Sequence, residues 1–187
     1  RITGGLEFST RFIQYLEVEA GVFEFQVLPN FENHPVVRMH WWGAAAFCAF
    51  YGLRLPTEAE WEKACRGGLQ YEYGTSDGTL NHELANYNGT GGRDQFDEPA
   101  PVGSFPANPY GLHDMSGNVA EFVFDLYSRT YYSNSPRNDP TGPGPQMLTS
   151  LLQGTAIWRG GSWIHEADSS RSAIRGQSSH QIDPNYL

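Results

Sequence analysis

Three polar side chains near the end of the chain have the residue types needed for acid–base or metal chemistry. They are His165, Glu166 and Asp168, which follow one another closely in the sequence. An imidazole beside two carboxylates can exchange protons with a substrate or bind a metal ion. The same residue types are also common on solvated surface loops. The three are therefore candidate catalytic residues, and their spacing alone leaves both interpretations open.

The middle of the chain offers oxygen atoms of the kind that hard cations prefer. Residues 69–117 are rich in Gly, Asn, Asp and Pro and show no helical period. Connections between elements are usually about 4–6 residues long, so something other than a hydrogen-bonded ladder must order this segment. A bound cation is one candidate. Asn and Asp also stabilise turns without any metal, so composition alone does not decide.

Composition and charge exclude several classes of partner. The chain has 187 residues, enough for one domain with a real core, and its formal net charge is −9. An acidic surface repels phosphate backbones and anionic lipids, so we expect no nucleic-acid partner. No apolar run approaches the roughly 20 residues that span a bilayer, so we expect no membrane insertion. We see no signal peptide, and Arg1 is not a natural start. An extracytoplasmic or secreted location is slightly favoured, and the sequence leaves the oligomeric state open.

Two helices are predicted to position these residues. The first covers residues 41–51, where apolar residues recur at helical spacing, and Gly52 is its expected C-terminal cap. The second covers residues 55–65 and has the sequence of a capping box, with Thr57 as N-cap and Glu60 three residues later. Gly67 and Gly68 end this helix.

Strands are predicted where apolar and polar residues alternate. They cover residues 22–27, residues 157–163 with a glycine break, and residues 171–175. Residues 128–156 form a second predicted loop region. We find no internal repeat and no linker, so the whole chain, residues 1–187, is predicted to be a single loop-rich α+β domain.

Four motifs in this order carry a resemblance to a known family. The chain resembles the formylglycine-generating enzyme, or sulfatase-modifying factor, family, and the match is strongest over residues 34–175. Residues 1–33 match poorly and a closing strand is missing, so both ends are expected to be truncated. The resemblance implies a C-type-lectin-like fold. The motifs are His34-Pro35-Val36-Val37, residues 54–62 (RLPTEAEWE), residues 108–121 (NPYGLHDMSGNVAE) and Arg159-Gly160-Gly161-Ser162-Trp163, followed by Arg171 and Arg175.

The resemblance implies two structural calcium sites. Transferred residue by residue, the first uses the side chains of Asn86 and Asp94 with the carbonyls of Tyr87 and Phe96. The second uses the side chains of Asp114 and Glu121 with the carbonyls of Gly117 and Val119. Every side-chain position in both sets holds an oxygen-bearing residue.

The chemistry of the family requires a pair of reactive cysteines after the Gly-Gly-Ser motif, and this chain has none there. His165 stands where the first active-site cysteine is expected, and Ser cannot replace a thiolate as a ligand for copper(I). The two cysteines, Cys48 and Cys65, lie on the predicted helices and are expected to be small buried side chains. We therefore expect no formylglycine-generating activity.

Two functions from different classes remain. The first is a binding module for a protein, peptide or glycan, with Trp163, His165, Gln177 and His180 on a ligand face of C-terminal loops. In that case residues 163–170 and 176–187 are surface loops, and Ser162, Arg171 and Arg175 lie beneath them. Arg171 and Arg175 are expected to anchor the fold through buried ion pairs, and arginines near a groove can also hold an anionic ligand. Some relatives diversify such loops for receptor binding. The second is an oxidoreductase or accessory enzyme that matures a peptide or small molecule on the same fold.

Overall fold

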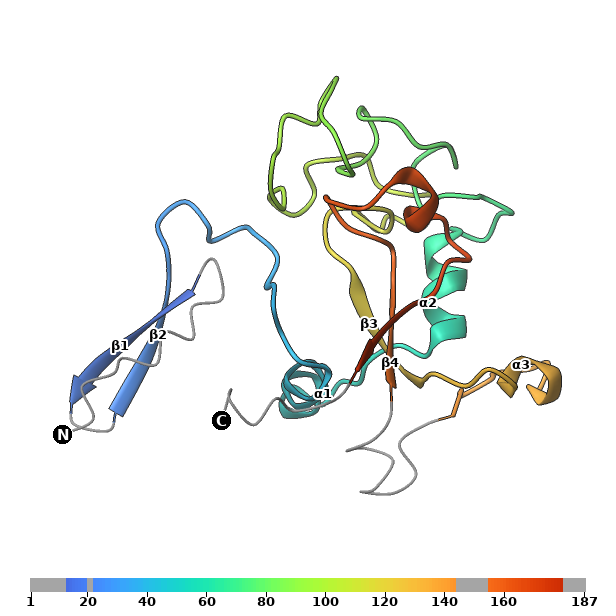
Figure 1. Ribbon diagram of the computed structural model, residues 1–187, viewed down its shortest axis with the longest axis horizontal. Coiled ribbons are helices and arrows are strands. Elements are labelled where there is room, and N and C mark those ends of the chain that lie inside the picture. Colours follow the sequence, from blue (N-terminus) through green and yellow to red (C-terminus); the bar gives the residue numbers. More distant parts are fainter. Residues whose placement is uncertain (1–12, 20–21, 144–154, 180–187) are drawn as a thin grey trace.

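The computed structural model describes residues 13–19, 22–143 and 155–179 (Figure 1). Helices and strands alternate with long irregular segments, which confirms the α+β, loop-rich prediction. The elements are β1 (Ile13–Glu19), β2 (Val22–Val27), α1 (Trp41–Phe50), α2 (Glu58–Cys65), β3 (Glu121–Leu126), α3 (Tyr131–Asn134), β4 (Thr155–Arg159), a 3-10 turn (Ala167–Ser170) and β5 (Gly176–Ser179).

Both predicted helices form, and local chemistry sets their ends. In α2 the Thr57 side chain accepts the Glu60 amide, and the Glu60 side chain accepts the Thr57 amide, so the predicted capping box is present. Helix α1 ends where Gly52 takes a left-handed φ of 70°. Its composition is unusual, because every residue from Trp41 to Phe50 is apolar or small, yet only Trp41 is buried.

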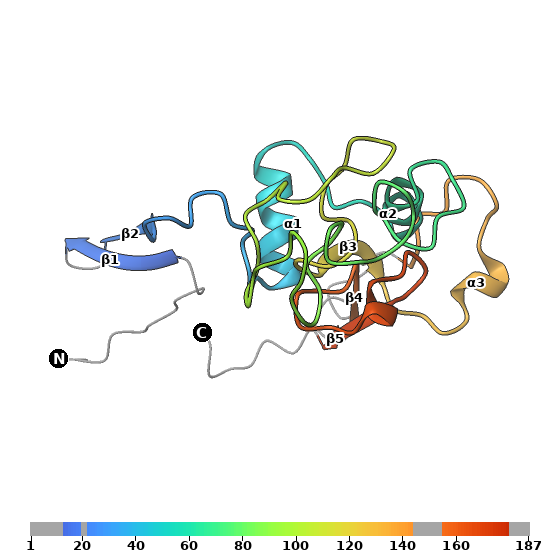
Figure 2. The same cartoon turned by 90° about the horizontal axis from the view of Figure 1, so that it is seen from above.

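The core is built on the two faces of an antiparallel sheet with the strand order β3-β4-β5. Figure 2 shows β3 and β4 between α1 and α2. Successive side chains of a strand point to opposite faces. Val123 and Ile157 accordingly pack with Trp61 on the α2 side. Ala156 packs with Trp41 on the α1 side, against Phe122 and Phe124.

The last strand is not where the sequence predicted it. Residues 171–175 form no strand beyond an isolated bridge between Tyr73 and Arg171, and β5 begins at Gly176. Gly176 pairs with Trp158, and a Cβ at position 176 would overlap the Trp158 indole. Only glycine fits there, so this contact fixes the register. Because residues 176–179 belong to the sheet, the prediction that they form a surface loop was wrong.

The remaining segments follow the predicted pattern with two additions. Residues 69–117 contain no helix or extended strand, as predicted. The described part of the predicted 128–156 loop contains the short helix α3 and the start of β4, and residues 144–154 lie outside the described residues. Strand β2 pairs with β1, and this hairpin lies apart from the sheet (Figures 1 and 2). Within the described residues no helix has the length and hydrophobicity needed to cross a bilayer.

Candidate functional site

His165 is held at the end of β4 by two contacts. Its Nδ1 lies 2.9 Å from Ser162 Oγ, within hydrogen-bonding distance. Its ring stacks on the Trp158 indole, with centroids 5.2 Å apart and planes 7° from parallel. Trp158 therefore lies between Gly176 and His165. The half-buried imidazole is fixed in orientation, and sequence reasoning missed Trp158 because the contact depends on the strand register.

The other two candidate catalytic residues point to different partners. The Glu166 carboxylate accepts the Asn88 side-chain amide at 2.7 Å, which connects the C-terminal loop to the 69–117 segment. Asp168 is exposed, and its carbonyl oxygen accepts Arg171 Nε at 3.2 Å. Among the described residues, no three His, Cys, Asp or Glu side chains gather as a metal site. The three candidates are neighbours in sequence but do not converge on one point.

Trp163 lines a groove that we call the Trp163 groove, of about 390 Å³. Its walls come from the segment before α1, from the start of β3 and from the loop after β4. Gln177 is exposed on β5, opposite Ile157 of β4, and His180 lies outside the described residues. The groove is lined by Val36, Val37, Arg38, Met39, Ala44, Leu55, Val119, Ala120, Glu121, Phe122, Ser162 and Trp163.

The first predicted calcium set is buried and only partly satisfied by hydrogen bonds. Asn86 and Asp94 are both 0% exposed. Asn86 donates its amide to the Glu98 carbonyl at 2.9 Å, and its Oδ1 has no hydrogen-bond partner among the described residues. One oxygen of Asp94 lies 2.9 Å from His82 Nδ1, and His82 stacks on Tyr87. The Phe96 amide donates to the other oxygen at 3.3 Å.

The second predicted set has the same incomplete character. Asp114 accepts the Gly103 amide at 2.8 Å with one oxygen, and its buried Oδ1 has no partner among the described residues. Burial raises the pKa of Asp114. Burial also raises the pKa of Glu121, and the Asp114 charge raises it further. Two partly desolvated carboxylates of like charge favour a proton or a cation between them.

The two sets adjoin each other through the backbone. The Asn118 amide donates to the Asn86 carbonyl at 2.7 Å. Gly117 has a left-handed φ of 86°, and a Cβ there would collide with the same carbonyl. Calcium prefers oxygen ligands. The side-chain oxygens of Asn86 and Asp114 that have no hydrogen-bond partner among the described residues therefore fit such an ion. The first set has one carboxylate and the second has two. Each set therefore depends on backbone carbonyls for its remaining ligands.

A network of buried charges lies beneath the site, and the sequence did not reveal its centre. Arg159 is 0% exposed and donates to Glu58 at 2.6 Å, to Glu62 at 2.7 Å and to the Ser172 carbonyl. Arg175 donates to both oxygens of Glu58, at 2.6 and 2.8 Å. Arg175 thus anchors the fold as predicted.

Two further charged residues, Arg171 and Asp125, make different contacts. Arg171 is not buried and approaches Glu72 only at 3.9 Å, so the expectation of a buried ion pair was wrong for this residue. Asp125 accepts the Glu58 amide at 2.7 Å at the start of α2. Burial raises the pKa of Asp125 to about 6.

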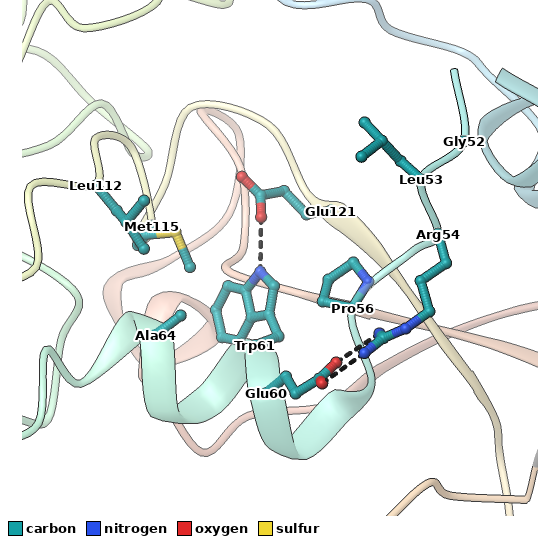
Figure 3. Close-up of a pocket in the computed structure, with 10 residues that line it drawn as sticks. All are labelled: Gly52, Leu53, Arg54, Pro56, Glu60, Trp61, Ala64, Leu112, Met115 and Glu121. Carbon is teal, nitrogen blue, oxygen red and sulfur yellow. Dashed lines mark hydrogen bonds and ion pairs between the residues drawn. The ribbon is translucent and has the colours of Figure 1, made fainter. Parts of the chain in front are cut away.

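A second groove, which we call the Trp61 groove, opens beside α2 and has a volume of about 950 Å³ (Figure 3). The Trp61 indole donates to the Glu121 carboxylate at 2.6 Å. Glu121 lines both the Trp61 groove and the Trp163 groove. Leu112 and Met115 lie on one side of the indole, with Pro56 and Leu53 on the other (Figure 3). The remaining lining residues are Gly52, Arg54, Glu60 and Ala64.

The two cysteines are free thiols. Cys65 is fully buried, as predicted, and burial raises the pKa of its thiol to about 11. Cys48 is half-buried on α1. Cys65 packs in the core with Trp61 and Val123, where a buried thiol is inert.

The fold and these motifs define the class of protein. The family model for the sulfatase-modifying factor enzyme 1-like domain matches residues 23–187 of the sequence, and the chain belongs to this family. This confirms the resemblance inferred from the four motifs.

Similar proteins carry different names. The formylglycine-generating enzyme of Streptomyces coelicolor is 39% identical over 167 residues, covering 81% of this chain and 49% of that protein. The serine/threonine-protein kinase pkn1 of Chlamydia caviae is 38% identical over 151 residues, covering 79% of this chain but 22% of that protein. The solved structure of PvdO from Pseudomonas aeruginosa superposes with a TM-score of 0.61 at 27% identity, covering 82% of this chain and 58% of that chain. The chain therefore spans about half or less of the curated relatives it matches.

Proposed function

We propose that this domain is a calcium-stabilised binding module without formylglycine-generating activity, whose ligand face is formed by the loops after β4. The observation that carries the calcium part is the pair of buried side-chain oxygens on Asn86 and Asp114 that have no hydrogen-bond partner in the part of the chain that the structure describes. An unpaired buried acceptor costs about 1–3 kcal/mol, and a coordinated cation removes that cost. Two ions would be held, one by each of the ligand sets described above, and they would order the 69–117 segment.

The position of His165 argues against the family's oxidase reaction. The resemblance puts a reactive cysteine there, and this chain has an imidazole in hydrogen-bonding distance of Ser162. The two cysteines of the chain are Cys48 and Cys65 on the helices. One similar protein is named as a formylglycine-generating enzyme and another as a serine/threonine-protein kinase. Membership of the family therefore does not fix one activity.

The Trp163 groove supports the ligand-binding part. It has an apolar lining, with polar groups at Arg38, Glu121 and Ser162 that can orient a bound molecule. Its walls are two irregular segments packed against the sheet, and irregular segments on a rigid support tolerate sequence change. The ligand class that fits is a peptide, protein side chain or glycan that places an aromatic or apolar group beside Trp163.

The absence of oxidase activity is directly testable. We expect a synthetic sulfatase peptide that carries the target cysteine to keep its thiol and gain no aldehyde when incubated with this protein. Mass spectrometry of the peptide measures both. The Streptomyces coelicolor relative, assayed in parallel with copper(I), serves as the positive control. Aldehyde formation by this chain would contradict the proposal.

The ligand face is testable with arrayed glycans and a displayed peptide library as probes. For any probe that binds, we expect Trp163→Ala to weaken affinity by roughly 30-fold, because a central Trp typically contributes 2 kcal/mol or more. Leu69→Ala, at an exposed residue after α2, is the matched control and should leave affinity unchanged. Binding that is insensitive to Trp163→Ala would place the ligand face elsewhere.

A further inference from the structure

The C-terminal end of α1 exposes an apolar surface that a solitary domain does not need. Phe47, Phe50 and Tyr51 are 60%, 82% and 61% exposed, and Leu53 is 66% exposed. We call these four residues the α1 face. No Asp, Glu, Lys or Arg occurs from Trp41 to Leu53. A helix that is apolar all round is normally buried, so this face is suited to a partner.

Leu53 of the α1 face also lines the Trp61 groove (Figure 3), so the face and the groove meet at this residue. Phe50 has the largest exposed fraction among the described large hydrophobic residues. A projecting aromatic side chain and an apolar groove therefore adjoin on one surface. At the rim, Arg54 donates to both oxygens of Glu60 at 2.7 Å, so these two charges neutralise each other.

A two-fold interface brings the same surface of two copies together, so a surface that carries both a projecting side chain and an apolar groove can pair with itself. We propose that two copies of this chain associate through the α1 face, with Phe50 of each copy inserted into the Trp61 groove of the other. The α1 face shares no residue with the Trp163 groove, and Glu121 is the one residue common to the linings of the two grooves. The proposed interface does not depend on the proposed ligand face.

Area and charge support a second copy as the occupant. An aromatic side chain covers about 150–250 Å², so the four residues of the α1 face expose roughly 400–600 Å² per chain. Two copies, with the groove lining added, reach the roughly 1,000 Å² that a specific interface requires. Each copy has a net charge of −9, so copies repel wherever their surfaces are charged. The uncharged stretch from Trp41 to Leu53 is a place where they can meet without that repulsion.

Sedimentation velocity and light scattering on the full chain, from about 1 to 100 µM, test the proposal. We expect a concentration-dependent species of twice the 20.9 kDa chain mass. Phe50→Glu should abolish it, while Val102→Glu, at a residue 58% exposed in the 69–117 segment, should not. Circular dichroism and melting curves confirm that both variants fold. A monomer at every concentration, or equal effects of the two variants, would overturn the proposal.

Crosslinking tests the docking geometry. The photoreactive residue p-benzoylphenylalanine in place of Phe50 should give intermolecular crosslinks to groove peptides that contain Leu112 or Met115. Crosslinks confined to one chain, or to other peptides, would refute the proposed insertion. Co-sedimentation of a monomer with phosphatidylcholine vesicles would assign the α1 face to a lipid surface and would also overturn the proposal.

Discussion

Replacing Arg159 with Met should lower the free energy of unfolding by about 3 kcal/mol, the low end of the 3–5 kcal/mol that removal of one partner of a buried ion pair usually costs. The variant loses the cation that contacts Glu58 and Glu62, and both carboxylates keep only part of their compensation. Arg175 still pairs with Glu58, which is why we expect the low end of the range. Such a loss lowers the melting temperature by about 6–12 °C for a chain of this size.

Calorimetry or urea unfolding measures the effect, and two variants make it interpretable. Arg54→Ala removes an exposed ion pair to Glu60 and should change stability little, because solvent screens such pairs. Glu58→Gln combined with Arg159→Met should lose less than the sum of the two single effects, because both residues take part in the same buried ion pair. A small effect of Arg159→Met, or a double variant that loses the sum of both single effects, would show that the charges do not act as a unit.

Calcium should raise the melting temperature, and a chelator should reverse the change. At an ion concentration about 100 times the dissociation constant, one site adds about 2.7 kcal/mol, which corresponds to roughly 5–10 °C here. Asp114→Ala should remove the increment from the second set, because it deletes the carboxylate whose buried Oδ1 has no hydrogen-bond partner among residues 13–19, 22–143 and 155–179. Asp97→Ala, an exposed acid in the same segment, is the control and should keep the full response.

The response should also depend on pH in a defined direction. The pKa values of Asp114 and Glu121 are raised in the folded state, so the ion-free fold binds more protons than the unfolded chain between the ordinary and the raised values. The stability of the ion-free protein therefore falls as pH rises through that range. Calcium replaces the protons, so its effect should be larger at about pH 7.5 than at about pH 5. Equal melting temperatures in calcium and chelator at neutral pH would contradict the calcium proposal.

Local sequence was a good guide wherever local chemistry sets the structure. Thr57 and Glu60 are three residues apart, and their capping box predicted the start of α2. The glycine at position 52 predicted the end of α1. The Gly- and Asn-rich composition of residues 69–117 predicted a segment without regular structure, because these residues favour turns.

Contacts between distant segments were beyond the reach of the sequence. Arg159 and Glu58 are separated by 101 residues, and each looks like an ordinary surface charge when read alone. The register of β5 depends on the space that Trp158 occupies at Gly176, which no propensity encodes. The Trp61 groove likewise combines residues from α2, β3 and the loop that holds Leu112, so no single segment of the sequence predicts it.

The position of β4 in the sheet has a consequence for synthesis. Strand β4 lies between β3 and β5, yet it is made from residues 155–159, near the end of the chain. As the chain leaves the ribosome, α2 and β3 emerge long before the strand that carries Arg159. Until residues 155–159 emerge, Glu58 and Glu62 stay hydrated, and Val123 lacks its packing partner Ile157. Closing contacts of such long sequence separation slows folding and prolongs the exposure of apolar surface. The nascent domain therefore keeps this apolar surface exposed until residues 155–159 are made.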